Sequence, residues 1–350
     1  MTAGISRRAS TTGPRRQPRL RRLQPYSQVG AAGVLFVVLL IVGSLLYPSF
    51  VSGQALMDLL IKNAFLIPLA VGMTFVILTG GIDLSVGAVM ALGTVITATL
   101  LQQGWPAAVV IPTVLVVGIG LGLLVGGMIS AFNIQPFIAT LAAMFFARGM
   151  CLVITDRSIA IDNDFFSWIN LAKINLWEAT TVNARGRVRV TDVSITPSVL
   201  IALALVLIAF LVLHYTRFGR TVYAIGGSES SSRLMGLAVT RTKVSVYAIS
   251  GCCAALSGLL FTFYTASGDP VAGIGYELNA IAAVVIGGTL LSGGYGYVLG
   301  SLLGVLTIGV IYAFKEFDGD LNTGWTRVMV GALLCFFIVL QRVIVARRLR

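Results

Sequence analysis

The sequence predicts an all-α, polytopic membrane protein with about ten transmembrane helices in one membrane domain. Hydrophobic residues make up 57% of the 350 residues and charged residues only 11%, less than half of the roughly 25% that is usual in soluble proteins. Apolar runs of about 17 or more residues recur along the chain, and each is long enough to cross a hydrocarbon core about 30 Å thick. These observations exclude a soluble globular domain.

Ten apolar runs, bounded by glycine, proline or charged residues, are the predicted spans. The first follows a basic tail, residues 1–28, and a second basic tail, 346–350, follows the transmembrane domain, 29–345. The polar interval 155–196 separates the fifth span from the sixth, and the basic segment 217–243 separates the sixth from the seventh. The eighth run is short and contains glycine, so it is either a full crossing or a re-entrant, broken helix. In chain order the runs are 29–47, 57–79, 84–101, 107–132, 137–154, 197–215, 244–266, 276–291, 297–314 and 326–345.

The cationic residues predict that both termini are cytoplasmic. Residues 1–28 contain seven arginines and no acid, the segment 217–243 contains five Lys and Arg residues, and four arginines lie near the C-terminus. Lys and Arg accumulate on the cytoplasmic side of membrane proteins. This orientation places sixteen of the 25 cationic residues inside and leaves the acidic segment with Glu316, Asp318 and Asp320 outside. The net charge of +12 therefore indicates topology and contact with anionic lipid, and no nucleic-acid partner is expected.

The interval 155–196 is the largest polar region on the predicted outer side. It contains Trp168, Trp177 and three alternating arginines, Arg185, Arg187 and Arg189. It is either an outer gate or docking platform for a soluble partner, or a solvated loop with two interfacial tryptophans.

The segment 217–243 contains a short predicted helix whose two ends are marked. Ser228 is suited to cap its N-terminus, Glu229 and Arg233 complement the helix dipole, and Gly236 provides a left-handed stop. A helix of about two turns is marginal alone in water, so we expect it to dock against a cytoplasmic partner. The candidate coupling residues are Ser228, Glu229, Arg233, Leu234, Met235 and Gly236.

Two glycine-rich segments, Gly80–Gly87 and Gly287–Gly294, share the pattern G-G-x-x-L-S-x-G. Paired glycines at membrane depth permit a helix break or close backbone approach, and the freed backbone groups need a cavity or neighbouring protein. A charge within a span is costly, so Arg148 is expected to face the bundle interior or a water-filled path. The candidate residues of the translocation pathway are Thr79, Gly80, Gly81, Asp83, Ser85, Arg148 and Asn279.

The sequence contains no pattern for catalysis or metal binding. One histidine excludes a His-based metal cluster, and there is no G-x-x-x-x-G-K-[ST] loop for ATP. The four cysteines all fall in apolar runs and are expected to be buried thiols. We therefore expect no enzymatic activity and no cofactor bound by this chain.

Four segments in order resemble the membrane permease subunit of ribose-type sugar ABC importers. They are Gly72–Gly93, Gln135–Met150, Arg217–Gly227 and Glu277–Gly294, and the similarity extends over about residues 57–341. Within that family the chain looks most similar to a permease of the galactofuranose importer.

The resemblance implies a permease fold in the bacterial inner membrane that forms the translocation pathway for a sugar. It implies three partners: a second permease subunit (a copy or a paralogue), a cytoplasmic ATPase with two fused nucleotide-binding domains that uses ATP and Mg, and a periplasmic or lipid-tethered sugar-binding protein. The segment 217–243 is then the coupling loop, and Gly80–Ser85 matches the family's GGIDLS signature beside the pathway. Asn279 departs from the family, whose members usually have Asp there.

Two other classes remain open on the sequence. An ion-coupled secondary transporter of a small polar solute would need ion-binding groups in the bundle, and only Asp83 and Glu277 are candidates. A membrane-embedded enzyme would need a His, Cys or paired-carboxylate site, which the sequence lacks.

Overall fold

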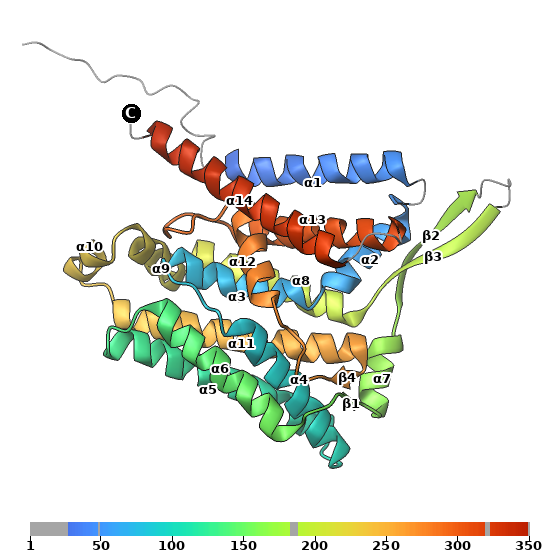
Figure 1. Cartoon of the computed structure of the whole chain (residues 1–350), viewed down its shortest axis with the longest axis horizontal. Coiled ribbons are helices and arrows are strands. Elements are labelled where there is room, and N and C mark those ends of the chain that lie inside the picture. Colours follow the sequence, from blue (N-terminus) through green and yellow to red (C-terminus); the bar gives the residue numbers. More distant parts are fainter. Residues whose placement is uncertain (1–26, 48–49, 183–187, 319–322, 349–350) are drawn as a thin grey trace, which may run out of the picture.

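The computed structural model describes residues 27–47, 50–182, 188–318 and 323–348, and it is a bundle of helices, most of which run along the long axis of the molecule (Figure 1). The predicted basic tail therefore lies almost entirely outside the described residues, as do Arg185, Arg187 and Asp320. The helices are α1 (Ser27–Leu46), α2 (Gly53–Asn63), α3 (Leu66–Leu78), α4 (Val86–Gln102), α5 (Ala107–Ala131), α6 (Pro136–Ile154), α7 (Asp164–Leu171), α8 (Pro197–Tyr215), α9 (Arg217–Gly227), α10 (Glu229–Leu234), α11 (Val239–Thr265), α12 (Tyr276–Ile286), α13 (Val298–Asp318) and α14 (Thr323–Arg348).

All ten predicted apolar runs contain helix, but fewer are long enough to span a membrane. Within the described ranges, seven helices are long and apolar enough to cross a bilayer, and the bent pair α2–α3 makes an eighth. The helices α4 and α12 are shorter. At 1.5 Å per residue, the 11 residues of α12 extend about 16 Å, roughly half of the hydrocarbon thickness. The eighth predicted span is therefore a short helix that does not cross by itself.

The second predicted span, 57–79, is two helices and not one. The axes of α2 and α3 differ by 58°, and α2 ends at Asn63, with Ala64 as its cap. Pro68, in the first turn of α3, cannot donate to the carbonyl of Ala64, and its ring would collide with that carbonyl in a continuous helix. The proline was the sequence signal for this break.

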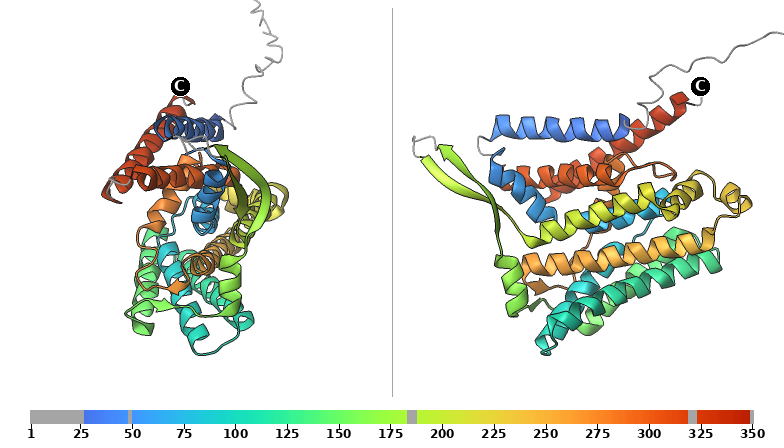
Figure 2. Two further views of the ribbon diagram at one scale, coloured as in Figure 1. Left: turned by 90° about the vertical axis from the view of Figure 1, so that its right-hand side faces the viewer. Right: turned by 180° about the vertical axis from the view of Figure 1, so that it is seen from behind.

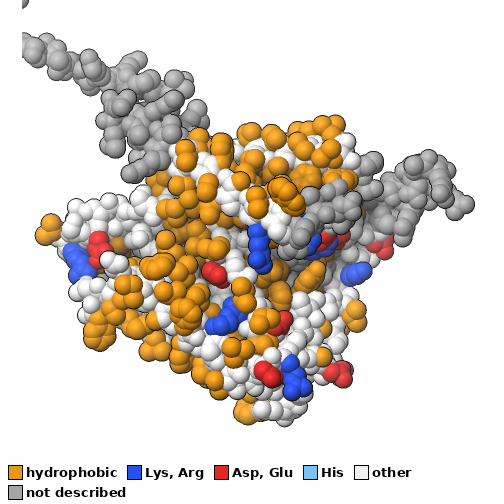
Figure 3. All heavy atoms as spheres, in the orientation of Figure 1, with side chains coloured by type: hydrophobic (Ala, Val, Ile, Leu, Met, Phe, Trp, Pro, Cys, Tyr) orange, Lys and Arg blue, Asp and Glu red, His pale blue; other side chains and the backbone are white. Residues whose placement is uncertain are grey.

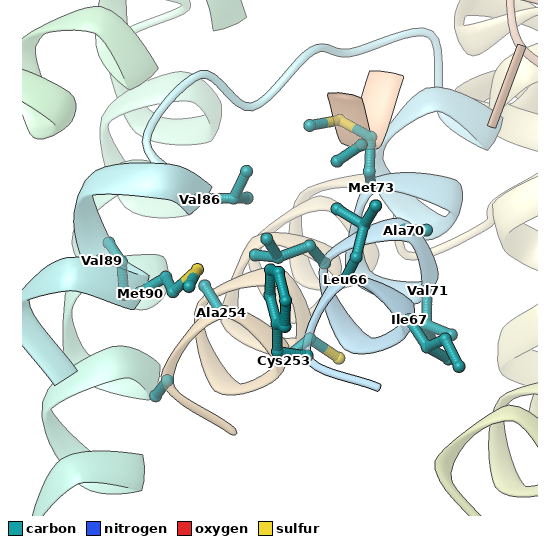
Figure 4. Packing of buried hydrophobic residues seen from close by; sticks show 14 of the residues in the cluster. Leu66, Ile67, Ala70, Val71, Met73, Val86, Val89, Met90, Cys253 and Ala254 are labelled. Atoms are coloured by element: carbon teal, nitrogen blue, oxygen red, sulfur yellow. The ribbon is translucent and has the colours of Figure 1, made fainter. Parts of the chain in front are cut away.

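The centre of the bundle is α3, all 13 residues of which are buried. It packs against α11, α12 and α13, and Figure 4 shows its apolar side chains beside those of α4 and α11. A helix that is apolar on every side is stable only where protein or lipid surrounds it completely.

The peripheral helices expose their apolar side chains outward. The most apolar stretch of α1 is only 11% buried, against 61% for α11 and for α13. Hydrophobic side chains cover much of the face shown in Figure 3, which is the surface expected of a protein embedded in lipid.

Two small sheets among the described residues correct the all-α prediction. The strands β2 (Ile174–Val182) and β3 (Val188–Ile195) form an antiparallel hairpin, and β1 (Ile159–Ala160) pairs with β4 (Ser267–Gly268). Both lie wholly or partly in the interval 155–196, where apolar or β-branched residues alternate with polar ones, as strands require. The hairpin is tied to α2, because the backbone N–H of Ser194 donates to the side-chain oxygen of Gln54 at 2.9 Å.

The hairpin and α10 lie at opposite ends of the molecule (Figures 1 and 2). The first residues of α1 and the last of α14 lie toward the end that carries α10. This arrangement agrees with termini on one side of the membrane, and the assignment of that side to the cytoplasm stays a prediction.

Candidate functional site: a coupling helix, a glycine junction and a cavity

The short helix predicted in the segment 217–243 is present as α10, with the predicted caps. The hydroxyl of Ser228 accepts a hydrogen bond from the backbone N–H of Ser231. At the other end Gly236 has a φ of +76°, its N–H bonds to the carbonyl of Arg233, and the N–H of Leu237 bonds to that of Ser232. This pair of bonds is a Schellman motif, in which a left-handed glycine ends the helix and the residue after it closes the outer of the two bonds.

Ion pairs fix α10 to the start of α11. Glu229 accepts from Lys243 of α11 and from Arg233 of α10. Partial burial of Glu229 raises the pKa of its carboxyl, but the hydrogen bonds and charges of Lys243 and Arg233 outweigh burial, so the net pKa is lowered. The apolar side chains of Leu234 and Met235 point away from these contacts and are 90% and 67% exposed. Two large apolar side chains held out on a capped helix are a surface suited to a protein partner.

The helix α9, which leads directly into α10, packs on both glycine-rich breaks. A side-chain carbon at Gly226 would lie closer than 3.0 Å to the Leu78 carbonyl and to the Gly294 N–H, and that N–H donates to the Leu78 carbonyl at 2.9 Å. Gly293 in turn lies against the backbone of Gly80. We call this contact of Gly80, Gly226, Gly293 and Gly294 the glycine junction. It connects the chain at α10 to the end of α3 and to the segment between α12 and α13.

The two breaks adopt different backbone conformations despite their shared pattern. In the first, Gly80 has a φ of +80°; in the second, Gly288, Gly293 and Gly294 have positive φ. These are not corresponding positions of G-G-x-x-L-S-x-G, so their conformations do not support an internal duplication.

The first break contains a buried carboxylate that three hydrogen bonds satisfy. Asp83 is 3% exposed and accepts from the backbone N–H of Ser85 at 2.9 Å, from its hydroxyl at 2.6 Å, and from the hydroxyl of Ser250 in α11 at 2.7 Å. The nearby Thr79 hydroxyl bonds to the Val76 carbonyl. There is no space for a side chain at Gly81, because the hydroxyl of Tyr247 lies against it.

The N-termini of the two short helices α4 and α12 meet inside the bundle. Gly87, in the first turn of α4, lies against the carbonyl of Gly273 and the carboxylate of Glu277. Glu277 is in the first turn of α12 and accepts from the N–H of Gly275, while Asp83 accepts at the start of α4. Each positive helix end therefore has a carboxylate of the chain itself beside it.

Arg148 and Asn279, the remaining candidate pathway residues, make contacts that the sequence did not predict. Arg148 donates to the carbonyls of Pro270 and Ala272 at 2.8 and 2.7 Å and so holds the segment between β4 and α12 against α6. Asn279 donates to the hydroxyl of Tyr312 at 2.9 Å. Of the seven candidates, Thr79, Gly80, Gly81, Asp83 and Ser85 lie together at the first break, whereas Arg148 and Asn279 lie apart from it along the sequence and on other helices.

A cavity of about 570 Å³ lies at the end of α11 remote from α10. The 27 residues of α11 separate the two ends by about 40 Å. Aromatic rings and charged side chains from α2, α3, α11, α12 and α13 line it, and none of the candidate pathway residues does. This cavity could not be predicted from the sequence, because its aromatic residues fall at helix ends, where interfacial tyrosines are common. The residues that form it include Asp58, Lys62, Asn63, Phe65, Phe261, Tyr264, Thr265, Tyr276, Gly309, Tyr312, Lys315 and Glu316.

No cluster of three or more His, Cys, Asp or Glu side chains that could hold a metal occurs in the part of the chain that the structure describes. The candidate pathway side chains of Asp83, Arg148 and Asn279 are hydrogen-bonded within the bundle. The exposed Leu234 of α10 lies at one end of the molecule and the cavity at the other. A bundle of apolar helices with hydrogen-bonded polar groups in its interior is the arrangement of a membrane-spanning protein.

Comparison with known proteins places the chain in a family. The family described as the permease component of the branched-chain amino acid transport system matches residues 55–338. The chain belongs to this family.

Individual relatives are similar over most of their length. The fructose import permease protein FruG of Bifidobacterium longum is 42% identical over 90% of this chain and 91% of its own. The inner membrane ABC transporter permease protein YjfF of Escherichia coli is 43% identical over 85% and 86%, and the ribose import permease protein RbsC of Haemophilus influenzae is 38% identical over 79% and 82%. No solved structure matches the chain significantly.

Proposed function

We propose that this chain is the inner-membrane permease subunit of an ATP-driven sugar importer and forms its translocation pathway. The relatives that are named as fructose and ribose import permeases support a monosaccharide as the transported solute. The chain has no P-loop, so a separate ATPase subunit that uses ATP and Mg supplies the energy. The resemblance of its motifs to a permease of the galactofuranose importer adds galactofuranose as a candidate beside fructose and ribose.

The observation that carries this function is the presentation of Leu234 and Met235 on a helix that is capped at both ends and joined to the glycine junction. In our proposal the ATPase, with two fused nucleotide-binding domains, receives α10 in a cleft. When the ATPase binds ATP and closes, it displaces α9, which packs against the backbones of Leu78 and Gly294. The displacement reaches the end of α3 and the segment between α12 and α13, because no side chain separates the backbones there. The pathway then opens to one side at a time.

Two further partners complete the importer. A second permease, either another copy or a paralogue, forms the other half of the pathway. A periplasmic or lipid-tethered sugar-binding protein delivers the solute at the end that carries the β2–β3 hairpin and the cavity.

The secondary-transporter alternative receives less support from the same geometry. An ion-coupling site needs ligands that are available to an ion inside the bundle. Asp83 is already hydrogen-bonded to Ser85 and Ser250, and Glu277 to Gly275.

The test is replacement of Leu234 and Met235 by serine in the chain coexpressed with its partner subunits. Both side chains are exposed, so we expect membrane insertion and melting temperature to stay at the wild-type level. We expect the ATPase to be lost from the purified complex, together with sugar uptake. Leu171→Ser, a substitution of a 76% exposed leucine on α7, is the matched control and should leave ATPase recovery unchanged. Undiminished uptake by the double variant would exclude α10 as the coupling helix, and uptake by the chain alone driven by an ion gradient would support the alternative.

A further inference from the structure

We propose that the cavity at the remote end of α11 is a low-affinity binding site in the permease for a neutral, polyhydroxylated ligand of monosaccharide size. This inference rests on the proposed function and adds a site within this chain. The site receives the sugar before it enters the pathway.

The size and position of the cavity agree with a ligand site. Ligand pockets in proteins measure about 300–1,000 Å³, and this one measures about 570 Å³. Side chains of α2, α3, α11, α12 and α13 enclose it, at the end of the molecule opposite α10. At the wall of the cavity, Gly309 leaves room for the amide of Asn63, which packs directly against it.

The charges of the lining favour a neutral ligand. The cavity contains two carboxylates, Asp58 and Glu316, and two ammonium groups, Lys62 and Lys315, so their formal charges cancel. Lys62 and Glu316 form an ion pair between α2 and α13, and Asp58 accepts from the side-chain amide of Gln54 at 2.7 Å. An ion would have to break these pairs to bind, whereas hydroxyl groups can donate to the carboxylates and accept from the ammonium groups without separating charge.

Aromatic rings supply the apolar part of the lining. Phe65 lies 5.1 Å from Phe261 and 5.2 Å from Tyr276, measured between ring centroids, so these three rings form one wall. Tyr264, which is 46% exposed, also lines the cavity and leaves part of its ring open to a ligand. The C–H groups of a sugar ring are apolar and pack on aromatic faces, while its hydroxyls reach the charged side chains. A mixed lining of this kind is what an amphipathic, uncharged ring requires.

The ion pair of Lys62 and Glu316 lies at the edge of the cavity. The two side chains are 41% and 51% exposed, whereas Asn63 and Phe65 are buried. The pair joins α2 to α13, and α2 is also bonded to the hairpin through Gln54 and Ser194. A protein docked on the hairpin could therefore displace α2, the helix that carries Lys62 at the edge of the cavity.

The experiment is solute protection of a thiol placed in the cavity. Thr265→Cys introduces a small thiol at a lining position, and Ser158→Cys introduces one at an exposed position near the same end that does not line the cavity. The whole importer, with its ATPase and binding protein, is reconstituted in liposomes. A water-soluble methanethiosulfonate reagent labels each variant, with D-fructose, D-ribose, D-galactose or L-leucine as the probe. Peptide-resolved mass spectrometry separates the introduced thiol from the four native cysteines.

We expect at least one of the sugars to slow labelling at position 265 by threefold or more, with no effect at position 158 and none from L-leucine. Tyr264→Ala, made in the Thr265→Cys chain, should remove the protection and lower sugar uptake while ATPase stimulation by the binding protein remains. Equal labelling with and without every sugar, in liposomes that import sugar with ATP, would overturn the cavity proposal and leave the proposed function standing. Stronger protection by L-leucine would overturn the neutral-ligand assignment. Protection by sugar without ATP-dependent uptake would support the cavity and refute the importer.

Discussion

Gly226→Ala tests whether the glycine junction connects α10 to the membrane helices. The added methyl group would lie closer than 3.0 Å to the Leu78 carbonyl and to the N–H of Gly294. Both are backbone groups, so neither can rotate away as a side chain would. The helix α9 must therefore move away from the breaks, or the bond between Gly294 and Leu78 must open.

The expected cost follows from these contacts. Overpacking of a close-packed site costs about 1–3 kcal/mol, and opening the hydrogen bond to buried Leu78 costs about 1–3 kcal/mol more. Alanine recovers about 0.5–1 kcal/mol, because it loses less backbone entropy than glycine in a helix. We therefore expect the free energy of unfolding to fall by about 1–5 kcal/mol, and the stimulation of the ATPase by the binding protein to fall with it.

Gly227→Ala is the matched control. Gly227 is the next residue of α9, and a side-chain carbon there would meet nothing within 4 Å. It should be neutral or stabilise the chain by up to about 1 kcal/mol. The assay is unfolding of the purified permease by SDS in mixed micelles, together with ATPase activity of the reconstituted complex. Equal unfolding curves and equal ATPase stimulation for the two variants would refute the reasoning.

Three further predictions concern single polar contacts. Ser250→Ala removes one of the three hydrogen bonds to buried Asp83 and should lower the free energy of unfolding by about 1–3 kcal/mol in the same SDS titration; an unchanged curve would show that the bond is not formed. The pKa of Glu229 is lowered below its ordinary value of 4.5, so its bonds to Lys243 stabilise α10 fully above about pH 4.5 and are lost as the pH falls through the lower folded-state pKa. Hydrogen exchange of the α10 amides should show this loss of protection in the wild type and not in Glu229→Gln, and identical pH profiles would contradict it. Arg148→Met should lower the free energy of unfolding by about 3–6 kcal/mol, since two charge-assisted bonds of about 1.5–3 kcal/mol each are lost, and should speed hydrogen exchange in residues 269–272. Changed uptake with unchanged stability would instead indicate a residue in the pathway.

The local features of the coupling segment could be predicted because neighbouring residues determine them. The local signals are a serine cap, an acid in the first turn, a cation in the last turn and a glycine at the stop, and they all lie within the nine residues Ser228–Gly236. The structure confirms the helix and its caps at Ser228 and Gly236. Its role in coupling stays a prediction, because that role depends on another protein.

The break between α2 and α3 also has a local cause, Pro68. It was not predicted, because Pro68 lies within one continuous apolar run, 57–79. Hydropathy averages over many residues and does not distinguish one straight helix from two short ones. The length of α12 could not be predicted from hydropathy either. The apolar run continues beyond Ile286, the last residue of α12, into a glycine-rich segment that is not helical. The strands of the hairpin were not predicted, because they lie in the polar interval 155–196 and long apolar runs indicate only membrane-spanning helices.

The sequence by itself determined the membrane class, the positions of the apolar helices, the short capped helix and the two glycine-rich breaks. Each of these depends on the composition or order of residues close together in the chain. Only the tertiary structure decided that Gly80, Gly226 and Gly293 meet at one junction, that Arg148 holds a loop, and that side chains from α2, α11 and α13 enclose a cavity. These features join residues up to about 250 positions apart, and their contacts depend on how the helices pack, which no local pattern specifies.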